Sequence, residues 1–421
     1  MKVLIITYYW PPAGGSGVQR WLKFVKYFRN FGIEPIVYTV TNGNYIKTDE
    51  SLLNEIPRDT RVLKQTMWQP EQLLFWRKPR SKHKQVATLT QNKFLTFIRG
   101  NFFVPDPKVF WVKKSVRFLT KVIRENNIEV IVSTGPPHSM HLIALKIKQK
   151  LGIQWLADFR DPWSNLYYNT DFKYLSIIKK IHKKLETKVL QQADVITTVS
   201  NSLQLEFEKT SNNVKVVTNG FDNEVLAVNE VLPDKKFSIS YIGLLPKQSH
   251  SDMFFKVLKS LIDTHEKFKK DLTVNFVGDI ANEVKAAVNK YQLEDYVNFK
   301  GYVQHQEAIQ IQQKSQVLLL LIPNVKYNKG ILTGKLFEYI TTKRPILAIA
   351  PKQGDLEEVL SRTNSGTVVE YTNEKKLTEE ILRLYHLYRC KTLHTQPKNI
   401  LQFHRQELTR QMAENLKQLI T

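Results

Sequence analysis

The chain has 421 residues, and its 62 Lys and Arg against 39 Asp and Glu leave a formal net charge of +23. An aromatic content of 11% with recurring apolar runs excludes disorder for most of the chain, and a single cysteine, Cys390, excludes a disulfide scaffold. The charge favours a polyanionic partner: a nucleic acid, an anionic membrane face or a phosphorylated substrate.

Short β-branched runs alternate with longer helical patterns along the whole chain, which predicts an α/β fold with parallel sheets. We expect two Rossmann-like domains, residues 1–222 and 236–400, joined near 219–235, and a C-terminal helix over 401–421. That helix would place Leu401, Leu408, Met412, Leu416 and Leu419 on one side. The predicted strands are Lys2–Thr7, Pro35–Val40, Glu129–Ser133, Gln154–Ala157, Asp194–Val199 and Val214–Val217 in the first half, and Phe237–Ile242, Leu272–Val277, Val297–Phe299, Val317–Ile322, Pro345–Ile349 and Thr367–Val369 in the second.

Residues 77–124 break this rhythm, because they hold thirteen Lys or Arg, one acid and seven large aromatic side chains. Such a mixture is typical of elements at a membrane interface and predicts a basic aromatic insertion. Residues 176–193 are a second candidate, with Ile177, Ile181 and Leu185 beside lysines, although an ordinary solvated helix explains that pattern equally well. No apolar run reaches the roughly 18–20 residues of a transmembrane helix, and the first residues resemble a buried strand more than a signal peptide.

A glycine-rich loop with Gly14, Gly15 and Gly17 follows the first predicted strand. Backbone N–H groups of such a loop can approach an anion, and the following helix adds its positive end. The spacing fits neither the dinucleotide fingerprint, whose third glycine would fall on Arg20, nor the P-loop. The alternative is a plain tight turn.

Two further strands of the first half end in polar residues. His138 follows a stiff Gly-Pro-Pro turn, so it either faces the ligand crevice or caps a surface helix. Asp158 and Asp161 flank Arg160 after the next strand. They suit acid–base chemistry, acceptor hydroxyl binding or an internal salt bridge. A metal is not expected, since no His or Glu cluster accompanies them.

In the second half, Thr333 is a plausible N-cap, so Gly334 and Lys335 would open a helix and favour phosphate. Glu338 lies three residues further on, where it could accept hydrogen bonds from a ribose diol. The alternative is a surface ion pair between Lys335 and Glu338.

The order of these motifs resembles the retaining GT-B glycosyltransferases of family 4, which build bacterial surface polysaccharides. The resemblance covers the whole chain and includes the glycine-rich loop, His138, the Asn219–Asp222 hinge, Tyr241-Ile242-Gly243, Phe276-Val277-Gly278 and the Lys-x-x-Glu helix. It implies an N-terminal acceptor domain, a C-terminal domain for a nucleotide-sugar donor, and transfer in the cleft without a metal or other cofactor.

The resemblance carries over unevenly to individual residues. Glu338 matches the second Glu of the family's E-x7-E signature, but the first falls on Gly330. The Arg and Lys that many members place after the Tyr-x-Gly turn are Leu244 and Ser249 here. The expected replacements for neutralising the diphosphate are Lys247 and Lys335. The candidate site residues are therefore His138, Asp158 and Asp161 for catalysis, and Gly14, Gly15, Gly17, Gly243, Lys247, Thr333, Gly334, Lys335 and Glu338 for the donor.

The partners implied are a nucleotide-sugar donor, a glycan or lipid-linked acceptor and an anionic membrane surface, with a cytoplasmic, peripheral location. A nucleotide-sugar epimerase and a non-catalytic GT-B subunit remain alternatives, the latter because of Gly330. A nucleic-acid-binding protein is the alternative of another class. The chain has no recognised nucleic-acid-binding motif, so we expect no specific nucleic acid.

Overall fold

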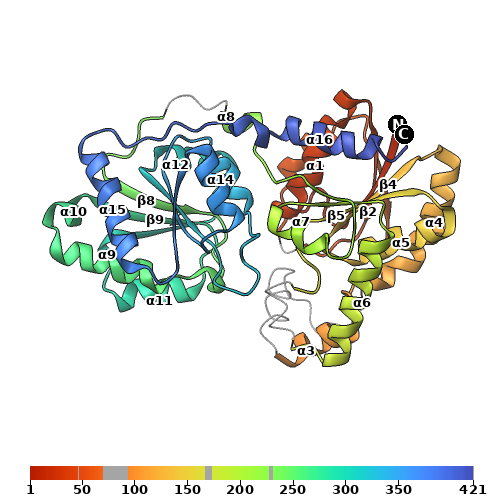
Figure 1. Ribbon diagram of the computed structural model, residues 1–421, viewed down its shortest axis with the longest axis horizontal. Coiled ribbons are helices and arrows are strands. Elements are labelled where there is room, and N and C mark those ends of the chain that lie inside the picture. Colours follow the sequence, from red (N-terminus) through yellow and green to blue (C-terminus); the bar gives the residue numbers. More distant parts are fainter. Residues whose placement is uncertain (46, 70–92, 166–172, 227–230, 421) are drawn as a thin grey trace. The chain divides into compact units, whose positions relative to one another are not determined.

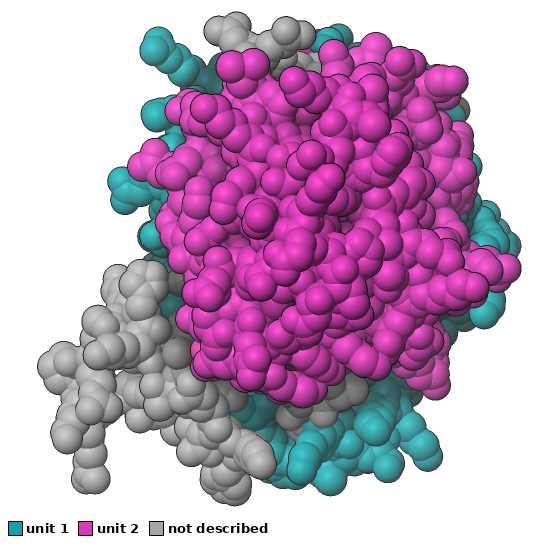
Figure 2. Space-filling view, turned by 90° about the vertical axis from the view of Figure 1, so that its left-hand side faces the viewer, with its two compact units in different colours: residues 1–218, 405–421 teal, residues 219–404 magenta. Residues whose placement is uncertain are grey.

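The computed structural model describes residues 1–45, 47–69, 93–165, 173–226 and 231–420. The chain divides into two compact units, Met1–Thr218 with Arg405–Thr421, and Asn219–His404. Figure 2 distinguishes the two units by colour. Each unit contains one parallel sheet with helices packed against it (Figure 1).

The first unit has a seven-stranded sheet in the order β3-β2-β1-β4-β5-β6-β7. Its central strands are buried on both faces, as the near-continuous apolar runs of a parallel sheet require. The strands are β1 (Lys2–Ile6), β2 (Glu34–Val40), β3 (Arg61–Gln65), β4 (Val130–Gly135), β5 (Gln154–Phe159), β6 (Val195–Thr198) and β7 (Val214–Val216). The helices are α1 (Ser16–Phe28), α3 (Lys93–Phe102), α4 (Val109–Asn126), α5 (Ser139–Leu151), α6 (Ser176–Gln192), α7 (Asn201–Phe207) and, from the end of the chain, α16 (Arg405–Lys417).

The second unit has a six-stranded sheet in the order β10-β9-β8-β11-β12-β13. Its strands are β8 (Phe237–Ile242), β9 (Leu272–Val277), β10 (Val297–Gly301), β11 (Val317–Leu321), β12 (Ile346–Ile349) and β13 (Gly366–Val369). The helices are α8 (Asn223–Leu226), α9 (Asp252–Thr264), α10 (Glu266–Asp271), α11 (Asn282–Lys290), α12 (His305–Lys314), α13 (Gly334–Tyr339), α14 (Asp355–Thr363) and α15 (Glu374–Arg389).

The strand order reverses once in each sheet, at β1 and β4 in the first unit and at β8 and β11 in the second. Ligands of open α/β sheets bind beyond the carboxyl ends of strands at such a switch point. The register aligns Ile6 with Ser133 and Gly135 with Phe159, so the loops after β1, β4 and β5 meet at one edge. The glycine-rich loop and the His138 loop are therefore neighbours.

The predicted α/β architecture is confirmed, and two local predictions are corrected. The expected insertion over 77–124 includes α4, whose Trp111, Val112 and Leu119 are buried in the core, so this part is the crossover helix between β3 and β4. Residues 77–92 lie outside the described residues. The sequence analysis missed β3 because this edge strand is only half-buried and its residues alternate weakly.

The C-terminal helix packs on α1 in the first unit, beside which it lies in Figure 1. Leu408, Met412 and Leu416 are buried there with α1. The prediction for Leu401 was wrong: it is 67% exposed in a short 3-10 turn, Ile400–Phe403, ahead of the helix. The apolar side of α16 thus attaches the C-terminal segment to the first unit.

Replacing Met412 by Ala should destabilise the first unit by about 2–5 kcal/mol, because a fully buried side chain is lost from a packed interface. All seven tryptophans precede Thr218, so tryptophan fluorescence in urea reports on this unit alone. Gln418→Ala, at an exposed position, is the control and should leave the midpoint unchanged. An unchanged midpoint for Met412→Ala would show that α16 contributes nothing to the stability of the unit.

Candidate active site

The glycine-rich loop and the His138 loop are joined by the side chain of Arg160, which extends from the end of β5. Its Nε donates to the carbonyl oxygen of Gly135 at 3.1 Å, and its Nη1 donates to that of Gly17 at 2.8 Å. Nη2 donates to the carbonyl oxygen of Pro136. A Cβ at Gly17 would lie 2.9 Å from Arg160 Nη1, so any larger residue there would displace the end of the Arg160 side chain. Gly15 needs glycine because of its φ of +93°.

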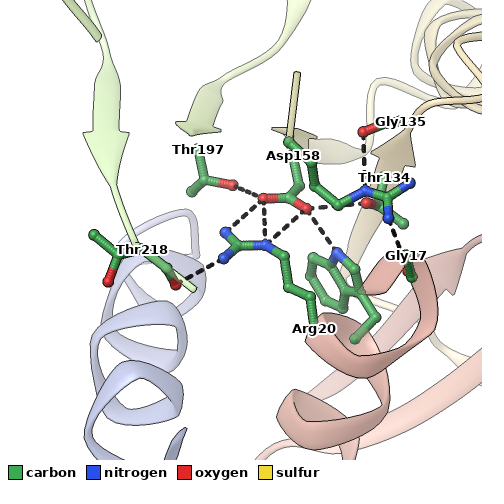
Figure 3. Close-up of polar contacts among 9 residues, drawn as sticks. Gly17, Arg20, Thr134, Gly135, Asp158, Thr197 and Thr218 are labelled. Atoms are coloured by element: carbon green, nitrogen blue, oxygen red, sulfur yellow. Dashed lines mark hydrogen bonds and ion pairs between the residues drawn. The ribbon is translucent and has the colours of Figure 1, made fainter. Parts of the chain in front are cut away.

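Asp158 lies in a buried network at the end of β5. Its carboxylate forms a 2.8 Å ion pair with Arg20 of α1, and both side chains are at most 1% exposed. The carboxylate also accepts from Trp21 Nε1 at 2.7 Å. Figure 3 shows the Thr134 and Thr197 hydroxyls, each 2.9 Å away, completing the set. Both carboxylate oxygens have protein partners, so the structure holds Asp158 in the internal salt bridge, one of the alternatives that the sequence left open.

The Arg20 guanidinium extends this network to Thr218, where the first segment of the first unit ends. Its Nη1 donates to the carbonyl oxygen of Thr218 at 2.9 Å (Figure 3). Burial alone would raise the pKa of the Asp158 carboxyl group. The charge of Arg20 and its hydrogen bonds outweigh burial and hold this pKa below its ordinary value. The network therefore links α1, β5 and Thr218, the last residue before the chain enters the second unit.

His138 lies in a stack of rings beside the loop that Arg160 holds. Its ring is 4.6 Å from that of Trp163 and parallel to it, and only 7% of the residue is exposed. Neither ring nitrogen has a hydrogen-bond partner among the described residues. Burial first, and then the nearby His141, His182 and Arg160, lower its pKa well below 6.5. His138 is consequently a neutral imidazole with unused hydrogen-bonding capacity.

His141 and Asp161 flank His138 and differ in how they are held. His141 bonds Ser133 through Nδ1 at 2.8 Å and stacks on Phe159, and burial lowers its pKa to about 3. Asp161 is partly buried, and this burial raises the pKa of its carboxyl group above the ordinary value against the charge of Arg160. Asp161 is thus the remaining carboxyl candidate for proton transfer in this unit.

In the second unit, the turns after β8 and β9 pack against each other. Gly243 and Gly278 have φ of +113° and +116°. A Cβ on Gly278 would lie 2.5 Å from the carbonyl oxygen of Gly243, so only glycine fits there. The Gly278 N–H donates to the carbonyl oxygen of Gly301, which aligns the ends of β9 and β10.

Lys335 extends from the start of α13 to this β8 turn. Its Nζ donates to Tyr241 Oη at 2.6 Å and to the Leu244 carbonyl oxygen at 3.2 Å, and it lies 3.2 Å from where a Cβ of Gly243 would be. Burial lowers the pKa of Lys335 to about 7, although the charge of Glu338 opposes this. The structure shows no ion pair between Lys335 and Glu338, whose carboxylate instead accepts from Gln312 Nε2 at 3.0 Å.

The other predicted donor residues lie around the same helix and turn. Thr333 precedes α13 as predicted, but its side chain makes no capping bond, and its buried hydroxyl has no partner among the described residues. Gly334 is the first residue of α13, and Gly330 is buried. Lys247 is exposed in a 3-10 turn, Lys247–Ser249, after β8.

Two geometric findings lay beyond the sequence analysis. The first is the pair of hydrogen bonds from Arg160 to Gly17, 143 positions away in the sequence, and to Gly135, 25 positions away. The only sequence signal for it was the cluster of charged residues in Asp158-Phe159-Arg160-Asp161. The contact of Tyr241 with Lys335 had no sequence signal. No group of three or more His, Cys, Asp or Glu gathers into a possible metal site in the part of the chain that is described.

Comparison with known proteins assigns both units. Residues 17–225 match the family described as Glycosyltransferase Family 4, and residues 236–386 match Glycosyl transferases group 1. A Bacillus subtilis (strain 168) protein named as a teichuronic acid biosynthesis glycosyltransferase, TuaH, is 25% identical over 206 residues, which are 46% of this chain and 50% of that protein. The match thus spans about half the length of this curated relative.

Solved structures share the fold of the whole chain. Sucrose-phosphate synthase from Thermosynechococcus elongatus has a TM-score of 0.66 and 14% identity, with coverage of 100% of this chain and 99% of that one. Anabaena Alr3699/HepE in complex with UDP has a TM-score of 0.65 and 14% identity, with coverage of 99% and 100%. At such identities the likeness shows the fold alone. With glycosyltransferase families matched in both units and two parallel-sheet units of the GT-B type, the chain belongs to the family 4 glycosyltransferases of the GT-B fold.

Proposed function

We propose that this protein transfers a sugar, with retention and without a metal, from a nucleoside diphosphate donor to a glycan or lipid-linked acceptor in the assembly of a cell-surface polysaccharide. The observation that carries the proposal is Lys335, a partly buried lysine at the switch-point turn of the second sheet to which the described residues give no carboxylate ion-pair partner. HepE is a fold neighbour crystallised with UDP and with UDP-glucose, and TuaH is named for teichuronic acid biosynthesis, which supports the donor and pathway class.

In the proposed reaction the second unit binds the donor and the first unit the acceptor. Breaking the bond between sugar and phosphate leaves negative charge on the diphosphate, which a fixed cation such as Lys335 stabilises. Glu338 would accept hydrogen bonds from the ribose, and exposed Lys247 would add charge at the phosphates. The neutral ring of His138 offers unpaired nitrogens to sugar hydroxyls, and Asp161 is the carboxyl group available for proton transfer.

The first test is a thermal-shift screen against UDP, GDP, CMP, dTDP and their sugars, with and without Mg²⁺. A ligand at 100 times its Kd should stabilise the protein by about 2.7 kcal/mol. Product analysis with the selected donor then distinguishes the alternatives. Transfer to an added acceptor supports a transferase, a changed donor sugar without transfer supports an epimerase, and donor binding with no reaction supports a non-catalytic subunit. Failure of every nucleotide to bind would contradict the proposal.

The affinity for the nucleoside diphosphate should fall as pH rises above about 7. Lys335 in the free protein loses its proton around that pH, whereas a bound diphosphate holds the ammonium charged, so binding above pH 7 takes up a proton. Calorimetry from pH 6 to 9 in two buffers of different ionisation enthalpy measures this uptake. Lys335→Met should bind weakly and show a flat pH profile, and a flat profile in the wild type would exclude this role for Lys335.

We further propose that the first unit attaches reversibly to an anionic membrane face through α6 and the end of α3, in keeping with a peripheral cytoplasmic location. Leu175 N donates to Asn101 Oδ1 at 2.8 Å, which joins the two elements, and they lie side by side in Figure 1. Four apolar side chains on them are 38–72% exposed: Phe102, Leu175, Ile177 and Ile181. Exposed lysines surround them on α6, and each can add about 1 kcal/mol near an anionic leaflet. Among the described residues, no helix is both long and apolar enough to cross a bilayer.

Ile177→Asp with Ile181→Asp should abolish co-sedimentation with phosphatidylglycerol vesicles and leave the fold intact. Two apolar groups that enter the interface are then replaced by anions that the leaflet repels. Leu205→Asp, at an exposed apolar position on α7, is the control and should sediment like the wild type. Equal sedimentation of all three proteins, or binding that survives in phosphatidylcholine alone, would contradict this surface.

A further inference from the structure

On one face of the second sheet, the amino-terminal parts of β8 and β9 are polar, where a parallel sheet is normally apolar. The carboxyl-terminal residues of these strands on the same face, Ile242 and Val277, belong to an apolar core cluster. Alternate residues of β8 and β9 that point to this face are Ser238, Ser240, Thr273 and Asn275, whereas those on the other face belong to the apolar core. Asn275 is 92% buried and donates to Ser240 Oγ at 3.2 Å. Asn298 of β10 donates to the side chains of Asn275 and Thr273. Thr273, Asn275 and Asn298 thus form a connected floor of amide and hydroxyl groups, and the buried Ser240 hydroxyl supports it through Asn275.

Four lysines surround this floor. Lys235 and Lys236 precede β8, Lys300 lies on β10, and Lys314 ends α12. The structure gives none of them a carboxylate partner among the described residues, and Asp234 is the single acid in the lining. The lysines and the floor line one cavity of about 500 Å³, together with Ile311. Four cations therefore face one carboxylate across a polar surface.

We propose that this cavity is a binding site for an anionic saccharide, separate from the donor site. The amides and hydroxyls of the floor match the hydroxyls of a sugar ring, and the lysines match its carboxylate or phosphate groups. The lining holds no aromatic side chain on which a nucleobase could stack, which disfavours a single-stranded nucleic acid.

The position of the cavity within the unit separates it from Lys335. Lys236 directly precedes the amino end of β8, and Gly243, against which Lys335 lies, follows its carboxyl end. Six strand residues at about 3.3 Å each span roughly 20 Å, more than the length of a sugar ring. The inference requires no transfer reaction, since it concerns binding alone.

The test is the affinity of the full chain for an oligogalacturonate of about nine units, measured by calorimetry. Lys300→Glu with Lys314→Glu should weaken binding roughly tenfold or more, because two cations become two anions beside the ligand. Lys267→Glu with Lys270→Glu, two exposed lysines of α10, changes the net charge equally and should bind like the wild type. UDP affinity, measured in the same proteins, should be unchanged in both variants.

Several results would overturn the inference. A neutral maltooligosaccharide of the same length that binds as tightly would remove the role of the lysines. A single-stranded DNA of equal charge that competes with equal affinity would reassign the cavity as a general polyanion surface. Equal loss of binding in both double variants would show that the affinity depends only on the net charge of the protein. Loss of UDP affinity in Lys300→Glu with Lys314→Glu would show that the cavity is part of the donor site.

Discussion

Lys335→Met should lower the transfer rate by roughly 10²–10³-fold. This is the effect of removing one preorganised group that stabilises charge in a transition state, and it raises the activation free energy by about 2.7–4 kcal/mol. The ammonium lies at the β8 turn and has no carboxylate ion-pair partner in the part of the chain that the structure describes, so a diphosphate is the natural counter-charge. Rates at saturating donor, with the donor chosen by the thermal-shift screen, measure the loss. Lys270→Met, an exposed lysine of α10, should retain full activity.

The same substitution should not destabilise the protein, which distinguishes a functional lysine from a structural one. The pKa of Lys335 in the folded protein is lowered to about 7, so below that pH the buried charge reduces the free energy of unfolding by its full amount. This cost disappears as pH rises from about 7 through the ordinary lysine value of about 10.4. Calorimetric unfolding of the wild type should show this rise in stability and Lys335→Met should lack it. A variant that loses stability and activity together would contradict the assignment.

Asp158→Asn should destabilise the first unit by about 3–5 kcal/mol, because it leaves the guanidinium of Arg20 buried without its counter-charge. Tryptophan fluorescence in urea, which reports on this unit alone, measures the effect. The lowered pKa of Asp158 means that its contribution is present above about pH 4 and is lost as pH falls through the folded-state value. The wild type should therefore lose stability in acid more steeply than Asp158→Asn.

A double-mutant cycle separates the ion pair from its surroundings. Arg20→Met combined with Asp158→Asn removes both charges, and it should recover much of the stability that Asp158→Asn alone loses. Asp161→Asn, three residues away, should leave stability nearly unchanged, because the structure shows no ion pair for Asp161 among the described residues. An Asp158→Asn protein of normal stability but without activity would restore a catalytic role to Asp158.

The sequence alone predicted the fold and the edges where the candidate sites lie. Apolar runs such as Lys2–Thr7 and Val317–Ile322 are local signals, because each buries its own residues on both faces of a sheet. Parallel strands bring their carboxyl ends to one edge, so the loops with Gly17, His138 and Gly243 could be placed before any coordinates. The glycine-rich turns and the start of α13 at Gly334 could also be predicted, because the backbone conformations that they require depend on neighbouring residues alone.

The tertiary structure decided which of those residues bind each other. Asp158 forms an internal ion pair because Arg20, 138 positions away in the sequence, lies next to it. Asp161 is only three residues further along the chain, yet its carboxyl group has different surroundings. α16 joined the first unit, and α4 proved to be a crossover helix, because shape and burial select the partner of an apolar stripe. Local periodicity shows that a face must be covered, but which segment covers it depends on contacts between residues far apart in the chain.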